Sequence, residues 1–387
     1  MASKSPLDQL LLVFDKWLHL PDHGVVEITL ATIAANRIEG DPVWLLLTGP
    51  PSSGKTEVLN TLRKLPDMYW ASTLTEAALL SGTSSKEVAD DATGGLLREI
   101  GPFGILALKD FTSVLSMNRD RRKSLLAALR EIFDGEWSRH LGTDGARTLR
   151  WDGKLGLLGG VTSAIDSCHS VMSEMGHRFA LYRLPKTDPQ AQAERAIQKT
   201  GLESQMRAEL ADAVFKFFGT IKFDKLPALS PHENEWIIAL ASLVVNSRSA
   251  VERHGNSRDV ELIHDAESPA RLARMLAQLL RGLMLVGVRQ PRARQLIVKV
   301  GMDCIPPVRR LVVEALMSSP LPLALETISD GTNYPPQTIR RALEELVCHG
   351  ILECDKLRGD AYKWKVEAYW RKQYETAFGA SAKKSEY

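Results

Sequence analysis

Residues 44–56 read Trp44-Leu45-Leu46-Leu47-Thr48-Gly49-Pro50-Pro51-Ser52-Ser53-Gly54-Lys55-Thr56 and set the architecture of the chain. An apolar run leads into a glycine-rich turn, and Lys-Thr then opens an amphipathic segment. This order predicts a strand, a loop and a helix. Gly49, Gly54, Lys55 and Thr56 complete the pattern G-x-x-x-x-G-K-[ST]. Such a loop aims successive backbone N–H groups at one point, and glycine permits the close approach of a phosphate.

The whole loop is therefore predicted to bind ATP together with Mg²⁺. Lys55 can reach the β- and γ-phosphates, and the Thr56 hydroxyl can ligate the metal ion. The helix that begins near Gly54 would turn the positive end of its dipole toward the anion. The alternative is a glycine-containing turn between strand and helix that binds nothing. The residues predicted to contact nucleotide in this loop are Gly49, Pro50, Pro51, Ser52, Ser53, Gly54, Lys55 and Thr56.

Two further apolar strands end in polar side chains. Residues 104–110 end in Asp110, where a carboxylate can hold the Mg²⁺ shell of a phosphate-loop enzyme. The alternative for Asp110 is an acidic cap on a hydrophobic strand. Residues 155–161 end in Thr162, which can sense the γ-phosphate or orient the attacking water. Strands that alternate with helices predict an α/β fold, with helices on both faces of a parallel sheet.

Bulk properties limit the class of protein. A chain of 387 residues is too long for one core and predicts two or three domains. A net charge of +2 gives no global nucleic-acid footprint, so any such surface must be local. Four scattered cysteines lack the spacing of a zinc site and fit a reducing compartment. No signal peptide and no run of about 20 apolar residues is found, which predicts a cytoplasmic protein without a membrane partner.

Changes in composition and in the hydrophobic pattern divide the chain into predicted parts. The predicted parts are an N-terminal helical collar (1–40), a phosphate-loop core (41–187), a helical lid (188–304), a winged helix-turn-helix (305–370) and a disordered tail (371–387). From residue 188 the pattern becomes helical, without a strand signal before the winged helix.

A β-hairpin is predicted within the core. Runs of alternating residues at 136–141 and 147–151 flank an Asp-Gly pair, which is a strong hairpin signal. Arg139, His140 and Arg147, with neighbouring tryptophans, suit a nucleic-acid backbone and its bases. The alternative is a surface hairpin whose arginines are solvated.

The C-terminal pattern of three helices and a hairpin over residues 306–366 predicts a winged helix-turn-helix. The side chains that it would offer to DNA are Gln337, Thr338, Arg340 and Arg341 on the third helix, and Arg358 in the wing. Nearby glutamates and aspartates leave this module almost neutral, so contact with another protein is the alternative.

The order of these features resembles the AAA+ ATPases. Within that group the chain is most similar to the hairpin-bearing branch, which includes minichromosome maintenance and superfamily 3 helicases and mobile-element replication ATPases. The resemblance spans roughly residues 25–366, and the phosphate loop is its specific motif. It implies a three-layer α/β core with a helical lid and a C-terminal winged helix. It also implies self-association into a ring or spiral, with the hairpin facing a central pore.

The resemblance implies roles for single residues. The loop would be Walker A, Asp110 Walker B, and Thr162 sensor 1. Arg178 resembles the arginine finger that reaches into a neighbouring subunit's site, and Arg271 resembles the sensor 2 arginine of the lid.

One departure concerns the catalytic base. The family usually has a glutamate directly after the Walker B aspartate, and here that residue is Phe111. Glu76, which follows the second predicted strand, could supply the carboxylate. Alternatively, hydrolysis is slow and ATP acts as an assembly switch.

The predicted function is a Mg²⁺-dependent ATPase that acts on DNA: a helicase, a helicase loader or a replication initiator of a phage or mobile element. A replisome protein or another protein partner fits this function. Two alternatives stay open. One is a transcriptional regulator with ATP as its ligand, and the other is an accessory ATPase of a transposition or defence system.

Overall fold

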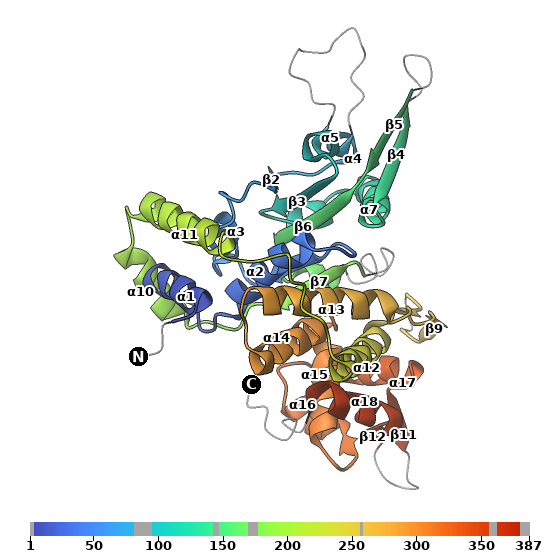
Figure 1. The fold of residues 1–387 in the computed structure, drawn as a ribbon. Coiled ribbons are helices and arrows are strands. Elements are labelled where there is room, and N and C mark those ends of the chain that lie inside the picture. The colour runs from blue at the N-terminus through green and yellow to red at the C-terminus, as the bar shows by residue number, and fades with distance from the viewer. Residues whose placement is uncertain are drawn as a thin grey trace. The chain divides into compact units, whose positions relative to one another are not determined.

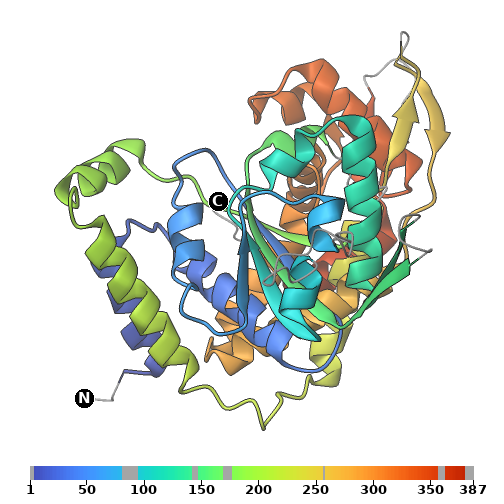
Figure 2. The ribbon, with the colours of Figure 1, turned by 90° about the horizontal axis from the view of Figure 1, so that it is seen from above.

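The computed structural model describes residues 4–80, 95–141, 147–168, 177–255, 258–355 and 362–379. The chain folds into two compact units, which Figures 1 and 2 draw in two views. Unit 1 is built from residues up to 168, from 178–227 and from 278–296. Unit 2 is built from residues 228–277 and from 297 onward. No described helix is long and apolar enough to cross a membrane.

Unit 1 contains a five-stranded parallel sheet in the order β2-β3-β6-β1-β7. Its strands are β1 (Trp44–Thr48), β2 (Met68–Ala71), β3 (Phe103–Leu108), β6 (Lys154–Val161) and β7 (Phe179–Arg183). Every residue of β1 is buried. The continuous apolar run of this strand is what a parallel sheet with both faces covered requires. The mixed α/β fold predicted for this part of the chain is therefore present.

Unit 1 also contains helices. They are α1 (Pro6–Trp17), α2 (Gly24–Arg37), α3 (Lys55–Asn60), α4 (Glu76–Leu79), α5 (Leu96–Ile100), α6 (Thr112–Leu115), α7 (Arg119–Phe133), α8 (Ala164–Ser167), α10 (Pro189–Gln198) and α11 (Glu203–Phe218). Of these, α2, α3 and α7 pack on the sheet. The end of α2 is tied to the start of β1, because the Asn36 side chain accepts from Val43 N and donates to Val43 O, both at 2.9 Å. This link sets the position from which β1 leads into the phosphate loop.

Helices α10 and α11 belong to unit 1, although the sequence placed them at the start of the lid. Helix α11 lies beside α1, as Figure 2 shows, and Lys16 pairs with Glu209 at 2.7 Å. It is also bound to α3, because Arg207 pairs with Glu57 at 2.6 Å. The apolar stripe of α1 needs a partner helix, and α11 supplies it. This packing joins segments that are far apart in the sequence, so the change to a helical pattern at residue 188 could not reveal it.

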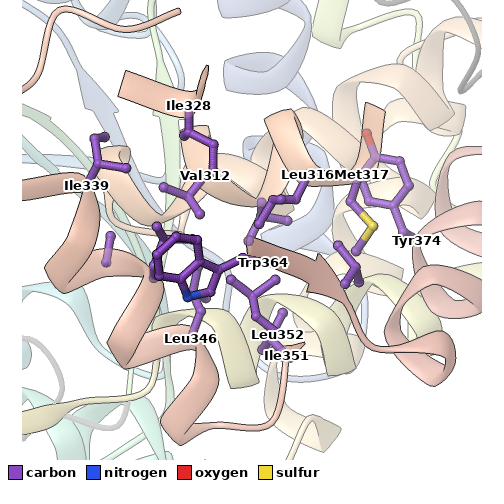
Figure 3. Close-up of a cluster of buried hydrophobic side chains, with 14 of the residues drawn as sticks. Val312, Leu316, Met317, Ile328, Ile339, Leu346, Ile351, Leu352, Trp364 and Tyr374 are labelled. Atoms are coloured by element: carbon purple, nitrogen blue, oxygen red, sulfur yellow. The ribbon is translucent and has the colours of Figure 1, made fainter. Parts of the chain in front are cut away.

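Unit 2 is mainly helical. Its elements are α12 (Pro231–Arg248), β8 (Val251–Arg253), β9 (Val260–Ile263), α15 (Pro307–Ser318), β10 (Leu323–Ala324), α16 (Leu325–Asp330), α17 (Pro336–Cys348), β11 (Leu352–Asp355), β12 (Lys363–Val366) and α18 (Ala368–Phe378). Helices α13 (Ala270–Leu285) and α14 (Gln290–Asp303) each have one end in each unit. Strands β10, β12 and β11 form an antiparallel sheet in that order. Figure 3 shows Trp364 of β12 among Val312, Leu346 and other side chains of its core.

The structure differs from the predicted elements of unit 2 in two places. Strands β8 and β9 form a hairpin in a segment where no strand was predicted. Helix α18 continues the ordered chain beyond residue 370, where the tail was predicted to begin, and Tyr374 and Ala377 in it are buried. Its aromatic residues Trp370, Tyr374 and Phe378 pack on the core of unit 2, a tertiary contact that holds the helix in place. Residues 380–387 lie outside the described part.

Candidate nucleotide-binding site

The loop after β1 adopts a backbone that depends on glycine. Gly54 lies directly before α3 with a φ of +86°, in the left-handed region that glycine occupies without strain. Ser52 also has a positive φ, of +62°, which is uncommon for a residue with a side chain. Two left-handed residues in so short a loop curl its backbone, and Thr56 is exposed just after the turn.

Lys55 is folded beneath this loop. Its Nζ donates to the carbonyl oxygens of Gly49 at 2.8 Å and Pro50 at 2.6 Å, and to Ser53 Oγ at 3.1 Å. Burial lowers the pKa of the Lys55 ammonium, and the negative charge of Asp110 opposes this shift. The residue is only 8% exposed. A buried ammonium that is held by neutral carbonyls gains a stronger partner when an anion enters the loop.

Strand β6 approaches the loop closely because Gly159 and Gly160 precede its last residue, Val161. A Cβ at Gly160 would lie 2.8 Å from the carbonyl oxygen of Lys109 and 3.7 Å from the Lys55 side chain. The Phe111 N–H donates to Gly160 O at 2.7 Å, which joins the chain after β3 to β6. The carboxyl ends of β1, β3 and β6 therefore meet at Lys55 and Asp110.

A small hydroxyl network connects two predicted site residues. The Thr112 N–H donates to Asp110 Oδ1 at 2.9 Å, and Thr162 N–H donates to Thr112 Oγ1 at 3.3 Å. The Oγ1 atoms of Thr112 and Thr162 are 3.5 Å apart. Asp110 is exposed and therefore accessible to a ligand. Sequence analysis missed Thr112, although an aspartate commonly bonds the backbone N–H two residues on.

Helix α10 also contacts the loop. The Gln192 side chain donates through Nε2 to the carbonyl oxygen of Ser52 at 2.8 Å. No sequence signal marks Gln192, because its role depends on where α10 lies in unit 1. This hydrogen bond holds the residue whose backbone is left-handed, and so it supports the shape of the loop.

Glu76 is bound to neighbours other than the loop. It is the first residue of α4, and its carboxylate accepts a hydrogen bond from Ser124 Oγ on α7. Arg139 Nε of the hairpin lies 3.8 Å from the other carboxylate oxygen. Strand β2, which precedes Glu76, is separated from β1 by β3 and β6. Adjacent strands lie about 4.8 Å apart, so β2 and β1 are separated by roughly 14 Å.

The two arginines that the family resemblance nominated are ion-paired within the chain. Arg178 is 6% exposed, and its Nη2 donates to Asp134 Oδ2 at 2.7 Å. It precedes β7, at the end of that strand opposite the loop. An exposed finger was expected, but a buried guanidinium requires a counter-charge, which Asp134 supplies. Arg271 lies in unit 2, where Glu267 accepts a hydrogen bond from it.

The predicted hairpin is formed by β4 (Glu136–Leu141) and β5 (Arg147–Asp152), and Figure 1 shows it beside α7. Side chains alternate along a strand, so the hairpin has two faces. The inward face consists of Trp137, Arg139, Leu149 and Trp151, of which all but the half-buried Arg139 are buried. The outward face consists of the exposed Ser138, His140, Thr148 and Arg150.

This alternation places Arg139 on the inward face, away from the exposed residues of the hairpin. It lies opposite Leu149 on the inward face, and its Nη1 donates to the carbonyl oxygen of Leu80 at 2.9 Å. His140 is on the outward face, where its Nδ1 is 2.9 Å from Thr148 Oγ1. The Arg147 backbone pairs with Leu141, and its side chain is outside what the structure describes.

An acidic cavity of about 480 Å³ lies at the base of the hairpin. Its lining residues are Glu131, Asp134, Glu136, Trp137, Ser138, Arg150, Trp151 and Asp152. Four of these eight are carboxylates, which repel phosphate groups. A nucleic acid on the outward face would therefore approach the hairpin nearer to its turn than to its base.

In unit 2, the exposed residues of α17 include Gln337 and Arg340, whereas Thr338 and Arg341 are half-buried. Arg358 lies outside the described residues. Glu345 pairs with Arg253 at 3.0 Å and with Arg309 at 2.8 Å. This carboxylate, which was counted against a basic surface in the sequence, is therefore neutralised within the unit.

No protein-family model and no curated protein matches the chain. Similar solved structures include the A form apo structure of the NrS-1 C-terminal region, with 13% identity and a TM-score of 0.30. The matched region spans 93% of this chain and 75% of the NrS-1 chain. Another is the SCCmec type IV Cch, described as an active helicase, with 9% identity and a TM-score of 0.38. There the coverage is 96% of this chain and 71% of that one. At these scores the likeness carries no functional argument.

The donors at the loop fit a magnesium nucleotide. Thr56 offers a hydroxyl, Asp110 a carboxylate and Lys55 an ammonium, and Mg²⁺ prefers oxygen ligands and retains several waters. Among the described residues, no group of three or more His, Cys, Asp or Glu side chains could hold a metal ion by itself. The metal ion would therefore depend on phosphate oxygens and water for the rest of its ligands.

Proposed function

We propose that this chain binds ATP with Mg²⁺ at residues 49–56 and hydrolyses it. The observation that carries this proposal is the position of Lys55, whose Nζ lies under the loop where the ends of β1, β3 and β6 meet. Loop N–H groups and Lys55 would bind the phosphates, and Thr56 and Asp110 would hold the metal ion. Bound Mg²⁺ would neutralise charge on the phosphate oxygens.

The chain's own groups then position the reaction. A water oxygen forms a bond to the γ-phosphorus while the bond to the β–γ bridging oxygen breaks, which releases ADP and phosphate. The proton lost by the water passes to a base, for which Glu76 is the proposed residue. Thr162, fixed by Thr112, lies at the end of the strand between β1 and β3. From there its hydroxyl can orient the water or contact the γ-phosphate.

We assign the ATPase to the AAA+ class, acting on DNA as a helicase, a helicase loader or a replication initiator of a phage or mobile element. The support is the sheet of unit 1, in which the strands that precede Asp110 and Thr162 lie next to one another beside β1. A protruding hairpin with an outward polar face supports the DNA role.

The proposal includes a winged helix-turn-helix over residues 307–366. Helices α15, α16 and α17 and the sheet β10-β12-β11 support it, with α17 as the helix that enters a DNA groove. Self-association into a ring or spiral is also proposed. Arg178 is given no part in it, because its guanidinium is buried against Asp134.

A second candidate function is a regulator that binds ATP without turnover. Two observations favour it: Phe111, in place of a glutamate, is fully buried, and Glu76 is bound to Ser124 and Arg139. Glu76→Gln separates the two functions. It should abolish turnover and keep nucleotide affinity if the chain is an ATPase that uses Glu76.

Calorimetry with Mg²⁺ and a non-hydrolysable ATP analogue tests the site. Lys55→Ala removes a charge-assisted contact with the phosphates and should weaken binding by about 10- to 100-fold. The matched control is Lys64→Ala, which removes an exposed lysine paired with Asp212 and should bind like the parent. Equal affinity of Lys55→Ala and the parent would refute the site.

A further inference from the structure

Helix α10 holds one peptide unit of the phosphate loop from outside. The side chain of Gln192 donates through Nε2 to the carbonyl oxygen of Ser52 at 2.8 Å. Ser52 is the serine of the loop whose φ is +62°. Left-handed backbone is unfavourable for a residue that carries a Cβ, so a contact from outside the loop helps to keep this conformation populated. The Gln192 amide supplies that contact.

The direction of the Ser52 carbonyl decides where the next N–H points. In a trans peptide the C=O and the following N–H point in opposite directions, so a Ser52 oxygen that faces α10 turns the Ser53 N–H away from this helix. The Ser53 nitrogen lies 3.4 Å from Pro50 O, an oxygen that also accepts from Lys55 Nζ at 2.6 Å. A backbone donor and a side-chain donor therefore converge on one acceptor within the loop.

The loop has few backbone donors to lose. Pro50 and Pro51 carry no N–H group, because the proline ring occupies that position. Between the two glycines of the motif only Ser52 and Ser53 can donate from the backbone. A misdirected Ser53 N–H would remove one of these two donors, so the orientation of this peptide matters for anion binding.

We propose that Gln192 is a positioning residue of the phosphate site. By holding the Ser52 oxygen outside the loop, it presents the Ser53 N–H to the phosphate groups. A phosphate oxygen then replaces Pro50 O as the acceptor of this N–H and of Lys55. Gln192 acts through the loop and does not itself contact the ligand. This inference rests on the proposed function, in which residues 49–56 bind the phosphates of ATP.

Polar contacts, rather than a core, place the helix that carries Gln192. No residue of α10 is buried. Arg195 Nη2 donates to the carbonyl oxygens of Asp15 and Lys16 in the last turn of α1, and Figure 1 shows α10 beside that helix. Helix C-termini leave carbonyl oxygens unsatisfied, which makes them suitable acceptors for a guanidinium. Because Arg195 lies three residues after Gln192, its contact with α1 sets the position of the Gln192 amide.

Binding of two magnesium-loaded probes to the full chain tests this role. One probe is a non-hydrolysable ATP analogue, and the other is inorganic tripolyphosphate, which has no base or ribose. Gln192→Met keeps the length of the side chain and removes the donor. The affinity for both probes should fall by about three- to ten-fold, as for one hydrogen bond, because only the phosphate contacts change. The matched control is Gln198→Met, at an exposed glutamine of the same helix, which should bind both probes like the parent.

A double variant tests the path from α1 to the loop. Arg195→Met should weaken the binding of both probes by no more than Gln192→Met does. The loss in the variant that carries both changes should equal that of Gln192→Met alone, because both changes release the same contact with Ser52. If the two losses instead add, the placement of Gln192 through Arg195 is overturned.

Steady-state hydrolysis distinguishes positioning from catalysis. The ground state and the transition state share the contacts of the loop with the phosphates, so Gln192→Met should raise the KM for ATP and leave kcat unchanged. Weaker binding of the ATP analogue with unchanged binding of tripolyphosphate would place Gln192 at the nucleoside and overturn the proposal. Unchanged affinity for both probes would also overturn it, while the loss in Lys55→Ala would still identify the phosphate site. A parent protein that binds neither probe would overturn the proposed function itself.

Discussion

Thr112 and Thr162 join the ends of two neighbouring strands through one hydroxyl, because Thr162 N–H donates to Thr112 Oγ1 at 3.3 Å. The Thr112 N–H in turn donates to the Asp110 carboxylate at 2.9 Å. One residue therefore sets the distance between the group proposed to hold Mg²⁺ and the group proposed to orient water. Sequence analysis identified both ends of this connection and missed its centre.

Replacing Thr112 by valine tests this connection. The valine keeps the shape of the side chain but leaves the Thr162 N–H without its acceptor. We expect kcat for ATP hydrolysis to fall by about ten-fold, as for the loss of one hydrogen bond at a half-buried group. Affinity for the ATP analogue should change little, since Lys55 and the loop are untouched. Ser167→Ala, which removes another hydroxyl after β6, should behave like the parent. An unaltered kcat in Thr112→Val would contradict the role.

Features with a local cause could be predicted from the sequence. The strand, loop and helix around Lys55 follow from an apolar run, two glycines and an amphipathic segment. The Asp-Gly pair marked the hairpin, and its strands pair as expected. The inward direction of Arg139 was also available, because it alternates in phase with Trp137 and Trp151. The basic and aromatic character of the segment favoured a DNA role for it instead.

Features that depend on distant partners could not be predicted. Gln192 reaches the loop only because α10 folds back onto unit 1. Strands β8 and β9 are only three and four residues long, which is too short for a strand pattern to be recognised in the sequence. Arg253 of β8 is held by Glu344, Glu345 and a backbone oxygen of α17, so tertiary contacts stabilise this hairpin.

Lys154 predicts a pH dependence of stability. Burial lowers the pKa of its ammonium to about 8, an effect that Asp41 partly offsets, and Nζ donates to the Ile38 carbonyl oxygen at 2.6 Å. In the unfolded chain a lysine has a pKa of about 10.4. Between these values the unfolded chain holds a proton that the folded chain lacks, so stability should rise with pH.

Urea unfolding near pH 8 and near pH 10 measures this effect. The parent should gain about 1 kcal/mol relative to Lys154→Gln over that range, a value reduced for the partial exposure of the side chain. Lys123→Gln, which removes an exposed lysine, should keep the parent's slope. If Lys154→Gln and the parent change equally with pH, the lowered pKa is wrong.

Arg253 should contribute to the stability of unit 2. Its side chain is 12% exposed and pairs with Glu344 at 3.1 Å and Glu345 at 3.0 Å. Arg253→Ala leaves the carboxylates of α17 with fewer partners, so we expect a loss of about 2 kcal/mol in the free energy of unfolding. Lys365→Ala breaks an exposed pair with Glu353 and should cost less than about 1 kcal/mol. Equal losses in urea unfolding of the two variants would show that the Arg253 contacts are not important.

Arg340 tests whether α17 meets DNA or protein. It is exposed on the helix, whereas Glu345 of the same helix is already neutralised by Arg253 and Arg309. If α17 enters a groove, Arg340→Ala should weaken duplex DNA binding by about 1–3 kcal/mol for a base contact. If Arg340 contacts a phosphate, the alanine variant should bind all sequences more weakly. The slope of log affinity against log salt concentration should then fall by about one.

Fluorescence anisotropy at several salt concentrations distinguishes these results, with the exposed Lys372 of α18 replaced by alanine as the control. Lys372→Ala removes the same charge from unit 2 but lies outside the proposed recognition helix, so it should bind DNA like the parent. If Arg340→Ala and Lys372→Ala both bind as the parent does at every salt concentration, α17 is not a DNA-reading helix. The module of residues 307–366 has a buried core of its own, so it would still be a folded unit. Because its exposed face would bind no nucleic acid, we would then assign the module to contact with another protein.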